Sequence, residues 1–259
     1  MMKRVIKILT ILIIILAIII IYLSTHGIKT ERFNNKIIES VSKINKKINL
    51  SLKEVNYLLN PLSLSISISA KNPTILVEDK SLYLSDINTN ISLKSFINNQ
   101  FSIDDLEIST KEIQIRDLIL LTRVVEGSAQ LFLLDSITKE GSITADISLM
   151  FDLDGKIKNN YQISGFVNKA KFNIFNQVEI ENLNLRFDIS KKQLTLRNIE
   201  TDLNNIQLKS PLIKIEEKKN IFFINGKVIN NQQNFDINKL KPILGDLFST
   251  IEIEEVDFN

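Results

Sequence analysis

The stretch "PLSLSISISA", residues 61–70, alternates apolar and small polar residues without interruption. Because every second side chain of an extended strand points to the same face, Leu62, Leu64, Ile66, Ile68 and Ala70 are expected on one face and four serines on the other. The apolar face of such a strand can pack against a second sheet, hold a bound apolar molecule or contact a membrane.

Alternation of this kind recurs along most of the chain and predicts a mainly β protein. In one long example, Ile143, Ile147, Leu149 and Phe151 share a face, and Gly155 is expected to close the strand. An exception is 117–136, which is too continuously apolar for alternation and is interpreted as a helical insert interrupted at Gly127. Strands are expected at 50–57, 61–70, 74–78, 82–96, 101–109, 112–118, 143–153, 161–168, 170–176, 178–189, 193–200, 205–209, 211–216 and 220–229.

The N-terminal residues predict a membrane anchor. Three basic residues, Lys3, Arg4 and Lys7, lie before and within the start of an apolar run from Val5 to Leu23. As a helix, this run would be about 28 Å long, enough to cross a bilayer core. The basic tail favours a cytoplasmic N-terminus, with the rest of the chain across the membrane. A cleaved signal peptide is the alternative. The candidate membrane-anchor residues are Val5, Ile8, Leu12, Leu16, Ile20 and Leu23.

Composition excludes several classes of site. The chain has no cysteine, so disulfides, thiolate catalysis and cysteine metal sites are ruled out. Its 32 basic and 30 acidic residues are interspersed, which argues against a nucleic-acid partner. The single histidine, His26, follows the predicted anchor and is interpreted as an interfacial residue. With no catalytic or phosphate-binding motif, we expect neither an enzyme, nor a metal site, nor a cofactor.

Internal similarity predicts repeated modules. Residues 84–93 match 180–189 in apolar character at an offset of 96, and the strands after them match at an offset of 93. An amphipathic helix at 34–49 followed by a strand is mirrored by a helix and strand near the C-terminus, so the chain is expected to be truncated, or short for its family. The expected divisions are an anchor at 1–27, a first β group with its helix at 28–136, a second β group at 137–236 and the start of a further repeat at 237–259.

These features together resemble the AsmA-like superfamily, which includes TamB and YhdP. The resemblance rests on the anchor, the short amphipathic helix and the segments "INLSLKEVNYLLNPLSLSISISA", "LYLSDINTNISLKSF", "FSIDDLEIS" and "EIQIRDL". It implies a single-pass protein of the bacterial inner membrane, with most of the chain in the periplasm. It also implies a curled antiparallel sheet that forms an apolar groove for phospholipid and supports lipid transport and outer-membrane integrity. A second resemblance, of "ISAKNP" to membrane-anchored late-embryogenesis-type β-sandwiches, covers only a few residues.

Three interpretations of the apolar face therefore stand at this point. In the first, the face lines an open groove for acyl chains. In the second, it is an ordinary closed core, and in the third the chain is a membrane-tethered scaffold that binds proteins at its sheet edges. An outer-membrane barrel is disfavoured by the N-terminal hydrophobic helix and the absence of aromatic girdles. The candidate groove residues are Leu62, Leu64, Ile66, Ile68, Ile143, Ile147, Leu149, Phe151, Leu185 and Phe187.

Overall fold

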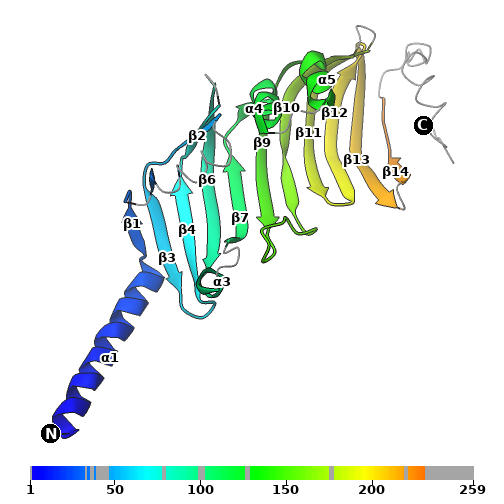
Figure 1. Ribbon diagram of the computed structural model, residues 1–259. Helices are drawn as coiled ribbons and strands as arrows, with labels where there is room; N and C mark the ends of the chain where they lie inside the picture. Colours follow the sequence, from blue (N-terminus) through cyan, green and yellow to red (C-terminus); the bar gives the residue numbers. More distant parts are fainter. Residues whose placement is uncertain are drawn as a thin grey trace. The chain divides into compact units, whose positions relative to one another are not determined.

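The computed structural model is mainly β, with one N-terminal apolar helix, few other helices and strands that belong to one large antiparallel sheet (Figure 1). It describes residues 2–32, 34–35, 38, 47–77, 80–98, 103–125, 129–174, 178–218 and 221–230. The chain divides into two compact units, Met1–Thr110 with Ile147–Tyr161 (unit 1) and Lys111–Asp146 with Gln162–Asn259 (unit 2). The predicted amphipathic helix at 34–49 lies mostly outside the described residues, and the predicted C-terminal helix and strand lie wholly outside them.

Unit 1 consists of a long helix followed by short and long strands. Its hydrogen-bonded strand order is β1-β3-β4-β6-β7, with β5 paired to β6 and β2 paired to β5. The elements are α1 (Met2–Thr25), β1 (Ile28–Thr30), β2 (Ile48–Ser51), β3 (Val55–Asn60), β4 (Ser65–Lys71), β5 (Thr74–Val77), β6 (Lys80–Ser92), α3 (Leu93–Ile97) and β7 (Ile103–Thr110).

The core of unit 1 lies at the boundary between β4 and β5. Asn72, with a φ of 48°, and the buried Pro73 interrupt the strand, so that β6 pairs with β5 through its first residues and with β4 through its last. The proline cannot donate a ladder hydrogen bond, which explains the break. The buried apolar side chains gathered at this level are Leu50, Val55, Ala70, Val77, Leu82 and Leu84.

Unit 2 consists of long strands in meander order with two helices. The strands from β10 to β14 pair in chain order, all antiparallel, and β8 pairs with β9. The elements are β8 (Ile113–Gln114), α4 (Ile115–Val125), α5 (Ala129–Ile137), β9 (Thr138–Met150), β10 (Gln162–Ile174), β11 (Val178–Ser190), β12 (Gln193–Leu203), β13 (Ile206–Lys218) and β14 (Ile221–Gly226); residues of β9 from Ile147 onward are assigned to unit 1.

The hairpin β6–β7 of unit 1 and the hairpin β11–β12 of unit 2 have the same register. Leu84 pairs with Thr110 as Ile180 pairs with Leu203, and Ile91 pairs with Ile103 as Phe187 pairs with Leu196. Asn88 opposite Glu107 likewise corresponds to Asn184 opposite Glu200. These pairs are related by the offsets of 96 and 93 that the sequence similarity predicts, so the internal repeat extends to backbone pairing. The expected module boundaries themselves stay a prediction.

Several strand predictions were wrong at their ends. Residues 61–64 form a turn, and β4 begins only at Ser65, because Asn60-Pro61 is a turn signal that outweighs the alternation following it. The predicted strand at 112–118 is two residues of β8 and the start of α4. The strand expected to reach 153 ends at Met150, and the predicted strands 161–168 and 170–176 are one strand. The helical insert at 117–136 is confirmed as α4 and α5.

Candidate functional site

Each unit has one sheet face formed by apolar side chains, and these two faces are the candidate site. In unit 1, antiparallel pairing places Leu59, Ile66, Ile91 and Ile103 opposite one another across β3, β4, β6 and β7. Residues directly opposite share a face and contact each other. The unit 1 apolar face comprises Val55, Tyr57, Leu59, Ile66, Ile68, Ala70, Ile87, Ile91, Ile103, Leu106 and Ile108.

Most of the unit 1 apolar face is half-buried. Val55 and Ala70 are buried, whereas the other side chains of this face, including those of Ile66 and Ile68, keep part of their surface accessible. Sequence alternation therefore assigned Ile66 and Ile68 to the correct face of β4. Leu62 and Leu64 do not belong to this face, because both lie in the turn before β4.

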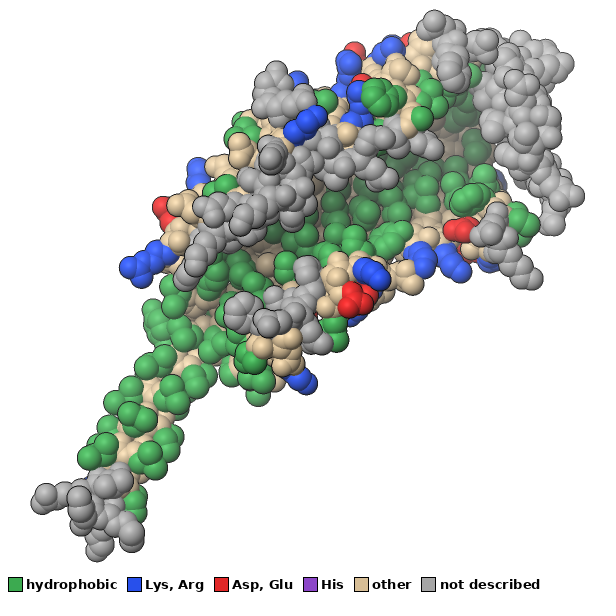
Figure 2. All heavy atoms as spheres, viewed as in Figure 1, with side chains coloured by type: hydrophobic (Ala, Val, Ile, Leu, Met, Phe, Trp, Pro, Cys, Tyr) green, Lys and Arg blue, Asp and Glu red, His purple; other side chains and the backbone are tan. Residues whose placement is uncertain are grey.

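The unit 2 apolar face has a buried centre. Ala145, Leu185, Phe187 and Ile199 form a cluster of buried side chains. Figure 2 shows hydrophobic side chains gathered over strands of the sheet. Half-buried side chains pack around them, and the unit 2 apolar face comprises these four with Ile143, Ile163, Val167, Leu183, Ile189, Leu194, Leu196 and Ile213. Leu208 of β13 continues the face, because it lies two residues before Ser210, which is paired with Ile199.

The structure thus brings three predicted groove residues, Ile143, Leu185 and Phe187, into one cluster. Ile147 and Leu149 are half-buried near the end of β9. Phe151 forms an isolated antiparallel bridge with Ile157 beyond that strand.

Backbone bulges keep the unit 2 face apolar where strict alternation fails. Lys169, Asn182 and Asn198 have φ angles of 48°, 52° and 51° in β10, β11 and β12. Each lies at a register shift, and an extra residue there moves the following side chains to the other face. As a result, apolar residues on both sides of each bulge face the same way.

Gly165 was missed by sequence reasoning and has a defined role. A Cβ at this position would lie 2.2 Å from the backbone oxygen of Thr144 and 2.6 Å from Cζ of Phe187, so the phenylalanine ring lies against the glycine. A lone glycine inside a strand pattern marks such a close approach and was the available signal.

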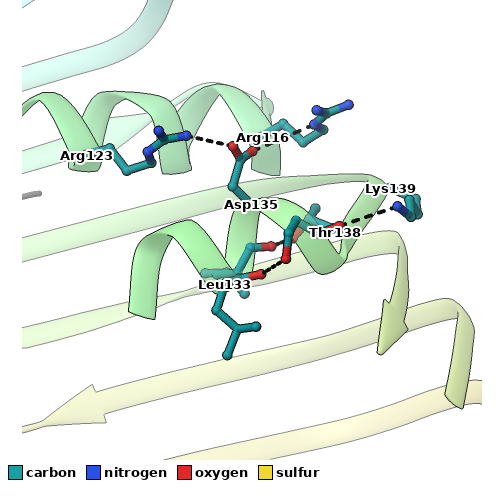
Figure 3. A network of polar contacts seen from close by, with 8 residues as sticks. Arg116, Arg123, Leu133, Asp135, Thr138 and Lys139 are labelled. Atoms are coloured by element: carbon teal, nitrogen blue, oxygen red, sulfur yellow. Dashed lines mark hydrogen bonds and ion pairs between the residues drawn. The ribbon is translucent and has the colours of Figure 1, made fainter. Parts of the chain in front are cut away.

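Helices α4 and α5 cover one part of the unit 2 face. Ile115 and Ile119 of α4 are buried against Ala170 and pack on Val167 and Leu183. The helices are joined by Asp135 of α5, whose carboxylate accepts a hydrogen bond from Arg123 at 2.7 Å and lies 4.0 Å from Arg116 (Figure 3). The Arg123 guanidinium also lies 3.9 Å from the centre of the Phe132 ring.

The opposite sheet faces are polar and paired. In unit 1, Ser67 donates to Asn90, which donates to Asp105 on the next strand at 2.8 and 3.0 Å. In unit 2, hydrogen bonds from the ammonium groups of Lys214 and Lys218 lower the pKa of Glu216 to about 2. Burial, followed by the neighbouring Asp105, raises the pKa of Asp104. The Glu216 carboxylate is thus stabilised by neighbours on the sheet, a pattern typical of a solvated face, whereas the surroundings of Asp104 disfavour its charged form.

Two surface cavities are lined mainly by polar residues, although Ile163 and Ile189 of the unit 2 apolar face also line the second. One of about 390 Å³ is lined by Lys29, Lys53, Glu54, Asn56, Ser69, Lys71 and Asn72. One of about 240 Å³ lies between the ends of β10, β11 and β12. Neither cavity is lined by a predicted groove residue. Among the described residues, no group of three or more His, Asp or Glu side chains could hold a metal ion.

Helix α1 is the other candidate functional element. Within Ile6–Thr25, a stretch of 18 residues has a mean hydropathy of 3.1, and the helix is long and apolar enough to cross a membrane, a property that it shares with signal sequences. The predicted anchor residues Ile8, Leu12 and Leu16 are exposed, whereas Ile20 and Leu23 are half-buried at the end of the helix that contacts β3. Val5 lies in the first turns of the helix.

Comparisons of the chain with protein-family models, with curated proteins and with solved structures give no match.

Proposed function

We propose that this chain is a membrane-anchored protein that holds phospholipid acyl chains along the apolar faces of its sheet. The observation that carries the proposal is the alignment of half-buried apolar side chains across neighbouring strands in each unit. The described helices that pack near these faces are short, and only α4 contributes buried side chains to a face cluster.

Acyl chains suit such a surface physically. Each CH₂ group removed from water contributes about 0.8 kcal/mol, so a sixteen-carbon chain gains roughly 12 kcal/mol before ordering costs are subtracted. A face lined by Ile, Leu and Phe needs no polar partner inside it. The unit 2 cluster, which includes Leu185 and Phe187, is of this type.

The wider context of the proposal comes from the AsmA-like resemblance. On that basis we propose a bacterial inner-membrane location, a cytoplasmic N-terminus and a periplasmic sheet that curls into a groove. The cargo is phospholipid, and the role is support of lipid transport and of outer-membrane integrity. The membrane-spanning length of α1 supports the anchoring part of this proposal.

The test compares charge on opposite faces of one strand. Leu208 is half-buried on the apolar face, and its neighbour Gln207 is exposed on the other face. The full chain, purified in detergent, is analysed for co-purified phospholipid by native mass spectrometry. Leu208→Asp is expected to lower phospholipid occupancy severalfold, and Gln207→Asp is expected to leave it unchanged. Ile66→Asp and Ser69→Asp form the matched pair in unit 1. Equal occupancy in folded Leu208→Asp, Ile66→Asp and control proteins would refute the proposal.

A scaffold that binds proteins at its sheet edge is the second candidate. The observation that favours it is β14, whose side chains are all exposed, including Ile221, Phe222, Phe223 and Ile224. Within the described part of the chain, β14 pairs only with β13. An exposed, apolar edge strand is a template for strand addition by a partner. A protein without bound lipid that captures a partner chain along β14 in crosslinking would favour this function.

A further inference from the structure

The turn between β3 and β4 carries exposed apolar side chains that are not buried against the sheet. Leu62 is 97% exposed and Leu64 is 55% exposed, and Leu64 has a φ of 50°. Ile97, at the end of α3, is 77% exposed. The amide of Leu93 donates to the carbonyl of Leu64 at 2.8 Å, which ties α3 to the turn. We call Leu62, Leu64 and Ile97 the apolar tip.

Strand direction places this tip on the side of unit 1 from which α1 enters. The chain leaves α1, passes Gly27 and starts β1, where Ile28 pairs with Tyr57 of the antiparallel β3. Strand β3 therefore runs back towards α1. Leu62 is five residues beyond Tyr57, so at about 3.3 Å per residue it lies up to roughly 16 Å from that pair in the direction of the helix. Figure 1 shows α1 and the β3–β4 turn at the same end of β1, β3 and β4.

The junction between helix and sheet is closely packed, which fixes this arrangement within unit 1. Gly27 has a φ of 68°, and a Cβ there would lie 2.6 Å from the backbone oxygen of Tyr57 and 3.1 Å from Cγ of Leu58. Helix α1 also contacts β3. A glycine with this φ joins the two elements at a distance that no other residue permits without strain.

The charges around the tip suit the boundary between lipid and water. Residues 60–66, "NPLSLSI", contain no charged side chain. Lys94 of α3 is exposed three residues before Ile97. An apolar tip with a lysine at its margin matches the interfacial region of a bilayer, where leucine side chains enter the acyl boundary and lysine reaches the headgroups.

We propose that the apolar tip inserts into the interface of the bilayer that α1 spans, so that unit 1 contacts the membrane at two points. The inference rests on α1 being a membrane span and is independent of whether the sheet faces hold lipid. A second contact would restrain how unit 1 pivots about Gly27. It would also direct the strands of unit 1 away from the membrane surface, since their other ends lie opposite the tip.

The absence of cysteine from the chain makes the test direct. Single cysteines replace Leu62, Ile97 or, as a control at the other end of β4, the exposed Lys71, and each is labelled with an environment-sensitive fluorophore in the full chain. The labelled proteins are placed in nanodiscs of phosphatidylcholine and phosphatidylglycerol. Circular dichroism of each variant confirms that the sheet is retained.

The expected result is a blue-shifted emission at positions 62 and 97, strong quenching by lipids that carry a spin label near the headgroup, and a severalfold loss of quenching by aqueous iodide relative to position 71. Iodide quenching at 62 and 97 equal to that at 71 would overturn the proposal. Protection from iodide without quenching by spin-labelled lipid would also overturn it, because it would mean that protein covers the tip.

Discussion

At the scale of single residues, Gly165 is a position where the unit 2 face leaves no room for a side chain. Gly165→Ala would place a methyl group against the Thr144 carbonyl and the Phe187 ring. Overpacking of this kind costs about 1–3 kcal/mol. We expect faster hydrogen exchange in β10 and β11 and a lower Tm, whereas Ser164→Ala, on the opposite face, should change neither appreciably. Unchanged exchange in Gly165→Ala would mean that the ring does not lie against this glycine.

The residues also show how far alternation predicts a face. Ile66 and Ile68 were assigned correctly, because period-two alternation holds within β4. Leu62 and Leu64 were assigned wrongly, because the alternation continues through a turn whose signal is only two residues long. In unit 2, the bulges at Asn182 and Asn198 shift the apolar positions by one residue. Period-two alternation does not predict such a shift, because it assumes that no extra residue is inserted.

At the scale of elements, the α4–α5 pair depends on Asp135. Asp135→Ala removes the hydrogen bond from Arg123 and leaves both arginines without this partner. Because the three side chains are partly exposed, we expect a loss of about 1 kcal/mol, expressed as faster hydrogen exchange in α5. Glu140→Gln, which removes an exposed carboxylate just after α5, is the control. If α5 exchanged at the same rate in Asp135→Ala and in the unchanged protein, the ion pair would not hold the helices together.

The repeated hairpins show that strand register can be predicted from internal sequence similarity. The offsets between 84–93 and 180–189, and between the following strands, predicted a register that β6–β7 and β11–β12 share. The offset of 93 also matches Ile113 and Ile115 to Ile206 and Leu208 in sequence. This part of the similarity was misleading, because Ile115 starts α4 while Ile206 and Leu208 lie in β13. Helix and strand can both bury apolar residues two positions apart over so short a segment.

At the scale of the whole molecule, composition and periodicity predicted a mainly β chain with an N-terminal apolar helix. Strand bounds, bulges and the position of α4 depend on tertiary packing and could not be read from periodicity alone. The chemistry of the candidate site is also simpler than that of a catalytic site, because it consists of apolar faces. The function of the chain therefore depends on what these faces contact.

The most direct test uses phospholipid with a photoactivatable group in its acyl chain. The full chain is reconstituted with this lipid and irradiated, and the adducts are located by mass spectrometry. If the apolar faces hold acyl chains, adducts form on these faces, at residues such as Ile68 and Leu196, in addition to α1, and none form on the polar faces of the same strands. Adducts confined to α1 and the apolar tip would contradict the proposed function and would mean that the apolar faces of the sheet do not hold lipid.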